Sequence, residues 1–353
     1  VEKGSTLSDG ADVASMYDDF NYNASDGNLS SYYSGNYALI HTANTILADI
    51  REAEESGVEL SEIDLACRGE AYFFRAFLYF NLVRAFGEVP LINFKINDAA
   101  ETNIPKSTVA EIYAQIDADL DEAEALLPEQ WESRYLGRVT WGAARALHAK
   151  TYMQRNDWSN MLKAATDIIQ SGLYDLNTPF NRIFRESGEN TSESIFELQC
   201  TATTALPGST DIGSQYAQIQ GVRGAGVWDL GWGWNCPTPI LADAFEEGDP
   251  RKDETLLYFL KPGEDPNSIQ PNSPYGEKPV AQEVMNRYYN KKVYTDPAKR
   301  AQFNRFGYWM NIRIIRMAEI YLIAAEAANE LGQTGDAMEY LEMVRARARG
   351  GDA

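Results

Sequence analysis

Apolar residues recur at helical spacing over long parts of the chain, and the densest run covers residues 66–86. The polar members of this run are Arg68, Glu70, Arg75, Asn81 and Arg84. At about 100° per residue they fall on two narrow seams with apolar positions between them. Gly87 and the extended Val89–Pro90 follow, as is typical of a helix end. The pattern predicts a long helix packed against other elements on more than one side.

Six further stretches match the template of an amphipathic helix. They cover residues 37–55, 107–127, 140–154, 157–171, 311–331 and 336–348. Ser61 with Asp64, and a Ser or Thr followed by Glu111, match N-terminal capping patterns. Small residues alternate with large ones in consecutive helices, and such pairs resemble tetratricopeptide repeats of about 34 residues. We expect three or four such pairs, stacked as an αα superhelix.

Residues 173–310 lack this periodicity. The sequence ESIFELQC at 193–200 is typical of a short strand, residues 207–239 are rich in Gly and Trp, and residues 261–279 are rich in Pro, Asn and Gly. Long irregular insertions of this kind usually carry function.

The predicted fold is therefore mainly α, with tetratricopeptide-like helix pairs and a large loop-rich lobe that contains short strands. We expect one domain over residues 1–353. Its helical scaffold lies at about 37–172 and 311–349, and its irregular ligand-binding lobe at about 173–310. Residues 1–35 are polar and are expected to form a surface segment with short helical pieces.

Composition narrows the classes of partner. With 353 residues, 44% of them hydrophobic and 12% aromatic, the chain can bury a sizeable core. The formal net charge of -21 argues against unassisted binding of nucleic acid or anionic lipid, since phosphate contacts need clustered Lys and Arg. The acidity also fits a simple role in solubility. No run of eighteen apolar residues is present, so a membrane link would need a lipid or a partner.

Neither a metal site nor a cofactor site is predicted. The three cysteines are far apart, and His41 and His148 stand alone in helical patterns. The run Asp117, Asp119, Asp121 lacks the Gly and Glu of a calcium loop, so we expect a solvated helix face there. The glycines near residue 224 do not follow the order of a nucleotide-binding fingerprint, and no hydrolase motif is present.

Aromatic residues in polar or Gly-rich surroundings are the best candidates for a ligand site. Exposed rings can stack on the apolar faces of sugars while polar neighbours bind hydroxyl groups. The rings can equally pin the irregular loop to the helical body, and we expect two of the five to contact ligand. The candidate ligand-binding residues are Tyr32, Tyr33, Trp228, Asp229, Trp232, Trp234 and Asn235; no catalytic residue is predicted.

Several blocks of sequence resemble the SusD/RagB family of Bacteroidetes outer-membrane lipoproteins. The most specific block is EAYFFRA, then YFNLVR and FGEVPLI, within residues 70–92. Three others follow in order: ESIFE at 193–197, GWGWNCPTPILADAFEEGDPR at 231–251, and residues 314–332 with VRARA at 344–348. The similarity extends from about residue 37 to the end of the chain.

This resemblance implies a cell-surface protein that binds nutrients without catalysis. Such a protein is anchored in the outer membrane by an N-terminal lipid that this chain lacks, and it passes oligosaccharides or polysaccharides to a SusC-like TonB-dependent transporter. The lipid-bearing Cys and the segment that usually follows the VRARAR region are absent, so we expect a chain trimmed at both ends. The ligand residues of the family vary, so the aromatic candidates rest on their own argument.

Three other functions remain open at this point. Some relatives serve peptide uptake, which makes a peptide the first alternative ligand. An all-helical glycoside hydrolase would need two carboxylates about 5 to 9.5 Å apart across a groove. A cytosolic helical-repeat scaffold is disfavoured by the Trp-rich insertion. Among glycans, starch, xylan, mannan and host glycans are all compatible with the sequence.

Overall fold

The computed structural model describes residues 17, 20–261, 263–268, 270–279 and 287–350. The chain divides into two compact units. The helical unit consists of Asn23–Asp175 and Ile315–Glu342, and the loop-rich unit is built around Leu176–Ile314 together with residues 343–350.

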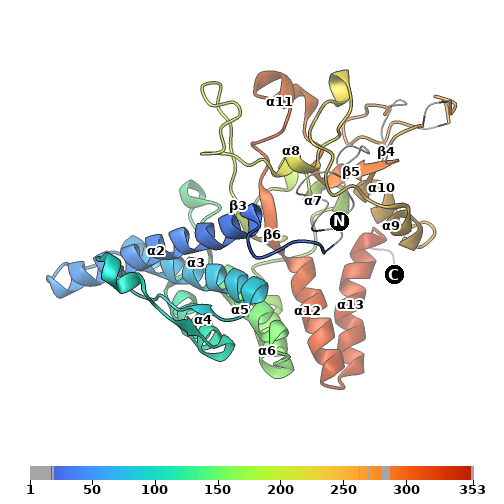
Figure 1. The fold of residues 1–353 in the computed structure, drawn as a ribbon. Helices are drawn as coiled ribbons and strands as arrows, with labels where there is room; N and C mark the ends of the chain where they lie inside the picture. Colours follow the sequence, from blue (N-terminus) through green and yellow to red (C-terminus); the bar gives the residue numbers. More distant parts are fainter. Residues whose placement is uncertain (1–16, 18–19, 262, 269, 280–286, 351–353) are drawn as a thin grey trace. The chain divides into compact units, whose positions relative to one another are not determined.

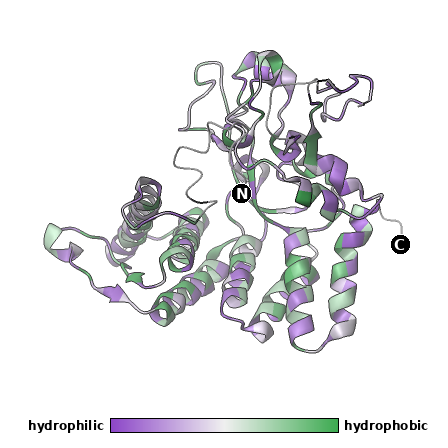
Figure 2. Ribbon diagram, turned by 45° about the vertical axis from the view of Figure 1, so that its right-hand side comes forward, coloured by the Kyte–Doolittle hydropathy of each residue, from purple (hydrophilic) through white to green (hydrophobic). Residues whose placement is uncertain are grey.

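Consecutive helices pack against one another throughout the helical unit (Figure 1). Contacts join α2 to α3, α3 to α4, α4 to α5, α5 to α6, and α6 to α12. Figure 2 shows hydrophobic and hydrophilic residues on the same helices, as the periodicity predicts. The helices are α2 Gly27–Glu55, α3 Glu62–Phe86, α4 Val109–Leu126, α5 Trp141–Gln154, α6 Trp158–Ser171, α12 Met317–Glu330 and α13 Thr334–Ala348, the last of which continues into the loop-rich unit.

The central helix α3 confirms the prediction for residues 66–86. Ser61 accepts a hydrogen bond from the Asp64 N–H, and the Asp64 carboxylate accepts one from the Ser61 N–H, so a complete capping box starts the helix. Gly87 ends it at φ 70°. The strand β1 Val89–Pro90 follows and pairs antiparallel with β2 Lys106–Ser107. The short 3-10 helices η2 Ala99–Thr102 and η3 Ser133–Tyr135 complete this unit.

The polar seams of α3 are explained by its neighbours. On one seam Arg68 pairs with Glu54 of α2, and Arg75 pairs with Asp119 of α4. On the other seam Glu70 accepts two hydrogen bonds from Arg138 at 2.9 and 2.6 Å. Each seam therefore faces a charged partner on an adjacent segment, and the apolar flanks fill the core.

Two predicted boundaries were wrong. Helix α2 begins at Gly27, because the Asp26 carboxylate accepts hydrogen bonds from the Asn28 and Leu29 N–H groups and caps a helix that was expected to start at residue 37. The helix expected from residue 311 is preceded by the strand β6 Ile312–Arg316, which pairs with β3 Ser194–Leu198. The β-branched residues of IRIIR favour this strand.

The prediction of a solvated face at residues 117, 119 and 121 was also wrong. Asp119 is 1% exposed and lies in a bidentate pair with Arg75. Asp117 accepts hydrogen bonds from Arg155 at 2.6 and 2.7 Å and lies 3.4 Å from Nε2 of His148. Asp119 thus links α4 to α3, and Asp117 links α4 to the end of α5. Both contacts form because basic residues distant in sequence face these carboxylates.

The loop-rich unit has little regular structure. Its short helices are α7 Phe180–Ile183, α8 Tyr216–Gln220, α9 Pro239–Ala244, α10 Pro250–Thr255 and α11 Pro297–Gln302, with 3-10 helices η4 Glu186–Gly188, η5 Gly226–Trp228 and η6 Lys291–Val293. Strand β4 Leu256–Tyr258 pairs antiparallel with β5 Tyr288–Asn290. The strand β3 confirms the prediction for residues 193–200.

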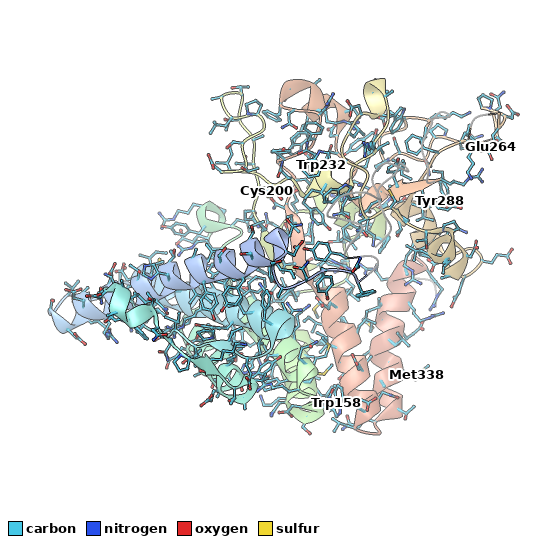
Figure 3. The ribbon with its side chains drawn as sticks, in the orientation of Figure 1. Trp158, Cys200, Trp232, Glu264, Tyr288 and Met338 are labelled. Atoms are coloured by element: carbon cyan, nitrogen blue, oxygen red, sulfur yellow. The ribbon has the colours of Figure 1, made fainter. Side chains whose placement is uncertain are left out.

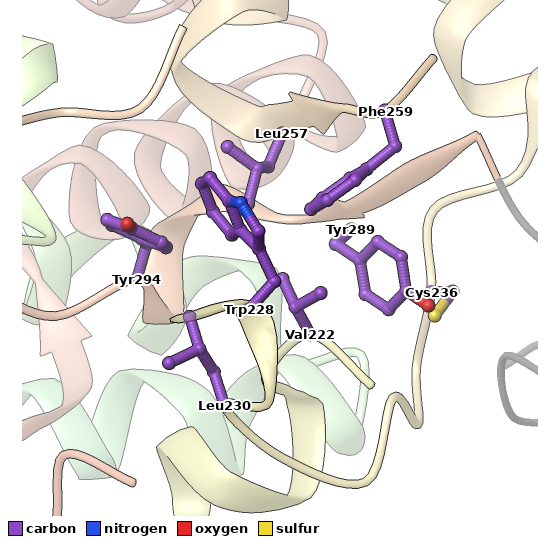
Figure 4. Packing of buried hydrophobic residues seen from close by; sticks show 8 residues of the cluster. All are labelled: Val222, Trp228, Leu230, Cys236, Leu257, Phe259, Tyr289 and Tyr294. Atoms are coloured by element: carbon purple, nitrogen blue, oxygen red, sulfur yellow. The ribbon is translucent and has the colours of Figure 1, made fainter. Parts of the chain in front are cut away.

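A compact hydrophobic cluster holds this unit together (Figure 4). Strands β4 and β5 contribute Leu257 and Tyr289, which lie opposite each other in the register. The remaining members come from η5 and from loops: Trp228 of η5, and Val222, Leu230, Cys236, Phe259 and Tyr294. The Trp-rich loop is thus part of the core of this unit at some positions and part of its surface at others.

Candidate functional site

The Trp-rich loop at residues 221–235 is held by its backbone against α8. The N–H groups of Trp232 and Trp234 donate to the carbonyls of Gln218 and Ile219 at 2.8 and 3.0 Å. This approach requires glycine at position 231, where an added Cβ would lie 2.1 Å from the Gln218 carbonyl oxygen. The loop is therefore a fixed platform, and its glycines serve close backbone contact.

Trp228 lies inside the core, so its prediction as a stacking ring for ligand is corrected. It is 4% exposed, and its ring packs at 5.2 Å and 83° against Phe259 and at 5.9 Å against Tyr294. Both partners come from segments at least 31 residues further along the chain. Trp228 anchors the loop, which is the second of the two interpretations that the sequence left open.

Trp232 and Trp234 form the exposed part of the loop. Trp232 is 38% exposed and Trp234 is half-buried, and their ring centroids are 5.5 Å apart at 51°. Figure 3 shows Trp232 beside α8. The half-buried ring of Trp234 supports its exposed neighbour, and the pair presents an aromatic surface with a fixed backbone.

The predicted polar residues of the loop already have protein partners. Asp229 pairs with Arg305 at 2.7 Å, and both side chains are partly exposed. The Asn235 side chain donates to Oε1 of Gln220 at 2.7 Å, and its backbone has φ 51°. Gln220 is buried and also accepts from Asn290 at 2.9 Å. These bonds fix the rim of the loop, and the exposed Asp229–Arg305 pair can exchange its contact for a ligand hydroxyl.

Tyr32 and Tyr33 belong to the helical unit and lie in the early turns of the long helix α2, whereas a surface segment with only short helical pieces was expected there. Tyr33 packs against Tyr37 at 4.9 Å and against Phe86 at 5.2 Å, edge to face. Tyr32 is 44% exposed, and its ring lies 6.3 Å from that of Phe86. Tyr33 therefore has a packing role at the end of α3, and only Tyr32 presents much of its ring.

Sequence reasoning missed the residues that surround the loop. Arg305 and Gln220 contact Asp229 and Asn235 from 76 and 15 positions away. No local pattern marks either residue, because the contacts arise only when separate loops fold together. Tyr216, which is 43% exposed on α8, adds a further ring to the segment that supports Trp232.

The described residues contain no group of three His, Cys, Asp or Glu side chains that could hold a metal ion. None of their helices is both long enough and apolar enough to cross a bilayer. The loop presents one exposed ring, supported by a half-buried one, beside neutral and charged hydrogen-bonding groups. This arrangement suits the binding of an uncharged polar ligand.

Two family models match the sequence. The model described as "Starch-binding associating with outer membrane" matches residues 2–153, and the model described as "SusD family" matches residues 192–352. Among curated proteins, "SusD-like protein P2" of Formosa agariphila is 29% identical over 334 residues, which are 92% of this chain and 63% of that protein. A "SusD-like protein" of Bacteroides ovatus is 26% identical over 95% of this chain and 63% of its own length. The chain spans less than two thirds of the length of these relatives.

Solved structures with the same fold are also found. A structure described as "Laminarin binding SusD-like protein" is 26% identical, with a TM-score of 0.78 over 99% of this chain and 76% of that chain. "Surface glycan-binding protein A from Bacteroides uniformis" is 24% identical, with a TM-score of 0.76 over 94% of this chain and 69% of that chain. The predicted class, mainly α with tetratricopeptide-like helix pairs and a loop-rich lobe with short strands, is confirmed.

Proposed function

This chain belongs to the SusD family, and from that premise we propose that it binds oligosaccharide or polysaccharide at the cell surface without catalysis. The single observation that carries the proposal is the exposed Trp232, supported by Trp234 on a backbone-fixed loop. A flat aromatic surface of this kind suits the apolar face of a sugar ring. The laminarin-binding relative at 26% identity makes β-glucan a sensible first ligand class to test.

The protein is proposed to act at the outer membrane, held there by a lipid anchor, and to deliver its glycan to a SusC-like TonB-dependent transporter. The family description that mentions the outer membrane supports this location. The transporter partnership can be tested by purifying the full-length lipidated protein from its native membrane. Recovery of a TonB-dependent transporter in that complex is expected. A protein that leaves the membrane alone in mild detergent would contradict the partnership.

The ligand site can be tested by isothermal titration calorimetry with laminarin, xyloglucan, starch and peptide oligomers. We expect the chain to bind at least one glycan and the double variant Trp232→Ala/Trp234→Ala to lose most of that affinity, because truncating an aromatic anchor of a binding surface commonly costs about 2 kcal/mol or more. Trp158→Ala, a half-buried tryptophan on α6 of the other unit, is the matched control.

Each other outcome has a definite meaning. Unchanged glycan affinity in the double variant would exclude the loop as the platform. Binding of peptides alone would transfer the site to the peptide-uptake alternative. The appearance of new reducing ends during incubation with the bound glycan would contradict a role without catalysis.

A further inference from the structure

The loop-rich unit contains a second candidate site, a polar cavity of about 410 Å³. It is lined by α7, η4, α10, the loop at residues 274–275 and the N-cap of α11. Its charged lining residues are Arg182, Arg185, Glu186, Glu254 and Asp296, and Tyr275 forms part of its wall. None of these residues belongs to the Trp-rich loop. The cavity has no part in the proposed function as stated above.

Arg185 is the unusual member of this lining. It is 7% exposed, and Nη1 donates to the carbonyl oxygens of Phe184, Lys291 and Tyr294 at 3.2, 3.0 and 3.1 Å. Nε is buried without any hydrogen-bond partner among the described residues, and none of their carboxylates forms an ion pair with this guanidinium. Burial lowers the pKa of Arg185. The nearby Glu254 opposes this shift without outweighing it. A buried guanidinium that forms no ion pair is costly to the fold, and a bound anion would relieve that cost.

The carboxylates of the cavity are already engaged elsewhere. Glu186 accepts a hydrogen bond from the indole N–H of Trp309 at 2.6 Å and forms an ion pair with Lys299. Glu254 lies 3.7 Å from the Lys291 ammonium. Asp296 caps α11 by accepting from the Ala298 N–H at 2.8 Å. Glu186 and Glu254 thus have cationic partners of their own, whereas Asp296 is held by a backbone N–H and keeps its negative charge in the lining. Arg185 is the buried cation of the cavity that forms no ion pair with a carboxylate of the described residues.

Arg182 adds a second guanidinium that has no carboxylate partner in the described part of the chain. Its Nε and Nη2 atoms donate only to the hydroxyl and the carbonyl of Ser187, at 3.4 and 3.2 Å. The backbone at Gly188 packs closely against the turn that contains Arg182 and Arg185. This contact needs glycine, because a Cβ at position 188 would lie 2.1 Å from the Arg182 carbonyl oxygen. Two arginines are therefore held on one rigid turn at the cavity.

Tyr275 supplies an apolar surface beside these charges. The residue is 40% exposed, and its ring lies 6.2 Å from Tyr294, which in turn packs on Trp228. Burial and the nearby Glu186 raise the pKa of Tyr275 to about 12, so its hydroxyl stays neutral. A neutral ring next to an unpaired guanidinium matches a sugar that bears an anionic group.

We propose that this cavity is a subsite for an acidic sugar residue, whose carboxylate or sulfate ester accepts hydrogen bonds from Arg185 while its ring lies against Tyr275. This inference rests on the proposed glycan-binding function and names a substrate class for it. The chain as a whole is strongly acidic, so any attraction for an anionic sugar comes only from the arginines at the cavity. Binding of the anionic sugar is expected to weaken as salt is added.

The test is a calorimetric or NMR titration with D-glucuronate, D-glucose 6-sulfate and D-glucose at low and high sodium chloride. At least one of the two anionic sugars is expected to bind roughly tenfold or more tightly than glucose, since hydrogen bonds to a charged group are strong. Tighter binding of D-glucuronate would indicate that the natural ligand carries a carboxylate, and tighter binding of D-glucose 6-sulfate would indicate a sulfate ester. Equal affinity of all three sugars would overturn the proposal.

Two variants assign the binding to this cavity. Asp296→Asn keeps an N-cap residue but removes a negative charge from the lining, so anionic sugars should bind severalfold more tightly. Arg185→Gln should abolish the preference for anionic sugars. The exposed Arg134 of the helical unit provides the matched control, and Arg134→Gln should change nothing.

Arg185 also holds three carbonyl groups. If Arg185→Gln fails to fold, Asp296→Asn decides the question alone. Unchanged or weakened binding of anionic sugars in Asp296→Asn would overturn the proposal, the latter because it indicates a cation-dependent site. Neutral glycan binding at Trp232 should be the same in Asp296→Asn as in the parent protein. If the parent protein binds neutral glycan but shows no preference for anionic sugars, only the subsite is refuted. If the parent protein shows the anionic preference but binds no neutral glycan, the proposed platform is refuted.

Discussion

Replacing Arg75 by methionine tests the packing of the central helix α3. Arg75 is 5% exposed and makes four hydrogen bonds, to Oδ2 and Oδ1 of Asp119 at 2.8 and 2.6 Å, to Asn44 at 2.8 Å and to the Asn93 carbonyl at 3.2 Å. Arg75→Met keeps the apolar stem but leaves the Asp119 carboxylate buried, with only Gln115 as its remaining donor. The substitution therefore exposes the cost of an uncompensated charge between α3 and α4.

The expected loss in free energy of unfolding is about 3–5 kcal/mol, the usual cost of removing one partner from a buried ion pair. With an m-value of about 2 kcal/mol/M, the urea midpoint of the helical unit should fall by about 2 M. Far-UV circular dichroism is a suitable signal, because most of the long helices belong to this unit. Arg68→Met is the control, since its pair with Glu54 is part-exposed and should contribute no more than about 1 kcal/mol.

The double variant Arg75→Met/Asp119→Leu completes the cycle. If the cost comes from the orphaned carboxylate, removing that carboxylate should restore much of the lost stability. A loss below about 1 kcal/mol in Arg75→Met would refute this reasoning. A double variant that loses at least the sum of the two single losses would refute it too, because the coupling between the two charges would then be absent.

Three further predictions concern pH and packing. Burial opposes the charge of His148, but the Asp117 carboxylate 3.4 Å from Nε2 and the Glu124 carboxylate hydrogen-bonded to Nδ1 outweigh it and raise the pKa of His148 above 6.5. The stabilising contribution of His148 should therefore be complete below about pH 6.5 and disappear as pH rises through the raised value. The difference in unfolding free energy between the parent protein and His148→Gln, measured from acidic to alkaline pH, should therefore shrink with rising pH, and a difference that grows would contradict this sign. Trp228→Ala should lose about 3–5 kcal/mol in urea unfolding because it empties a core position, and a loss under about 1 kcal/mol would show that the indole is not packed as described. Gly231→Ala should displace the Trp-rich loop from α8, which would appear in calorimetry as reduced glycan affinity and in near-UV circular dichroism as an altered tryptophan signal; an unchanged spectrum would contradict the close backbone contact.

The helices could be predicted from the sequence because their signals are local. The capping box at Ser61 starts α3, and Gly87 ends it. Each signal involves residues within about one helical turn, so the sequence pattern shows it directly. The apolar periodicity of α4 to α6 reports which face is buried for the same reason. The start of α2 was missed although Asp26 is a good cap, because the polar residues that follow it weaken the apolar pattern.

Partners of charged residues could not be predicted. Asp119 belongs to a run of alternating acidic residues that is typical of a solvated surface, yet it is buried by an arginine 44 positions away. Arg185 gives no signal in the sequence at all, since its exceptional property is the absence of a carboxylate partner among the described residues. Both facts depend on which segments meet in space, and periodicity carries no information on that.

The Trp-rich loop shows the same division within a few residues. Sequence alone determined that three tryptophans stand close together in a Gly-rich segment, and hence that the segment is both irregular and aromatic. Only the tertiary structure decided that Trp228 is core and that Trp232 faces solvent, because Phe259 and Tyr294 arrive from distant segments to bury the first and nothing among the described residues covers the second to the same extent. Backbone propensity acts between neighbours, whereas burial is a property of the whole folded unit, and the choice of which ring can meet a ligand belongs to the latter.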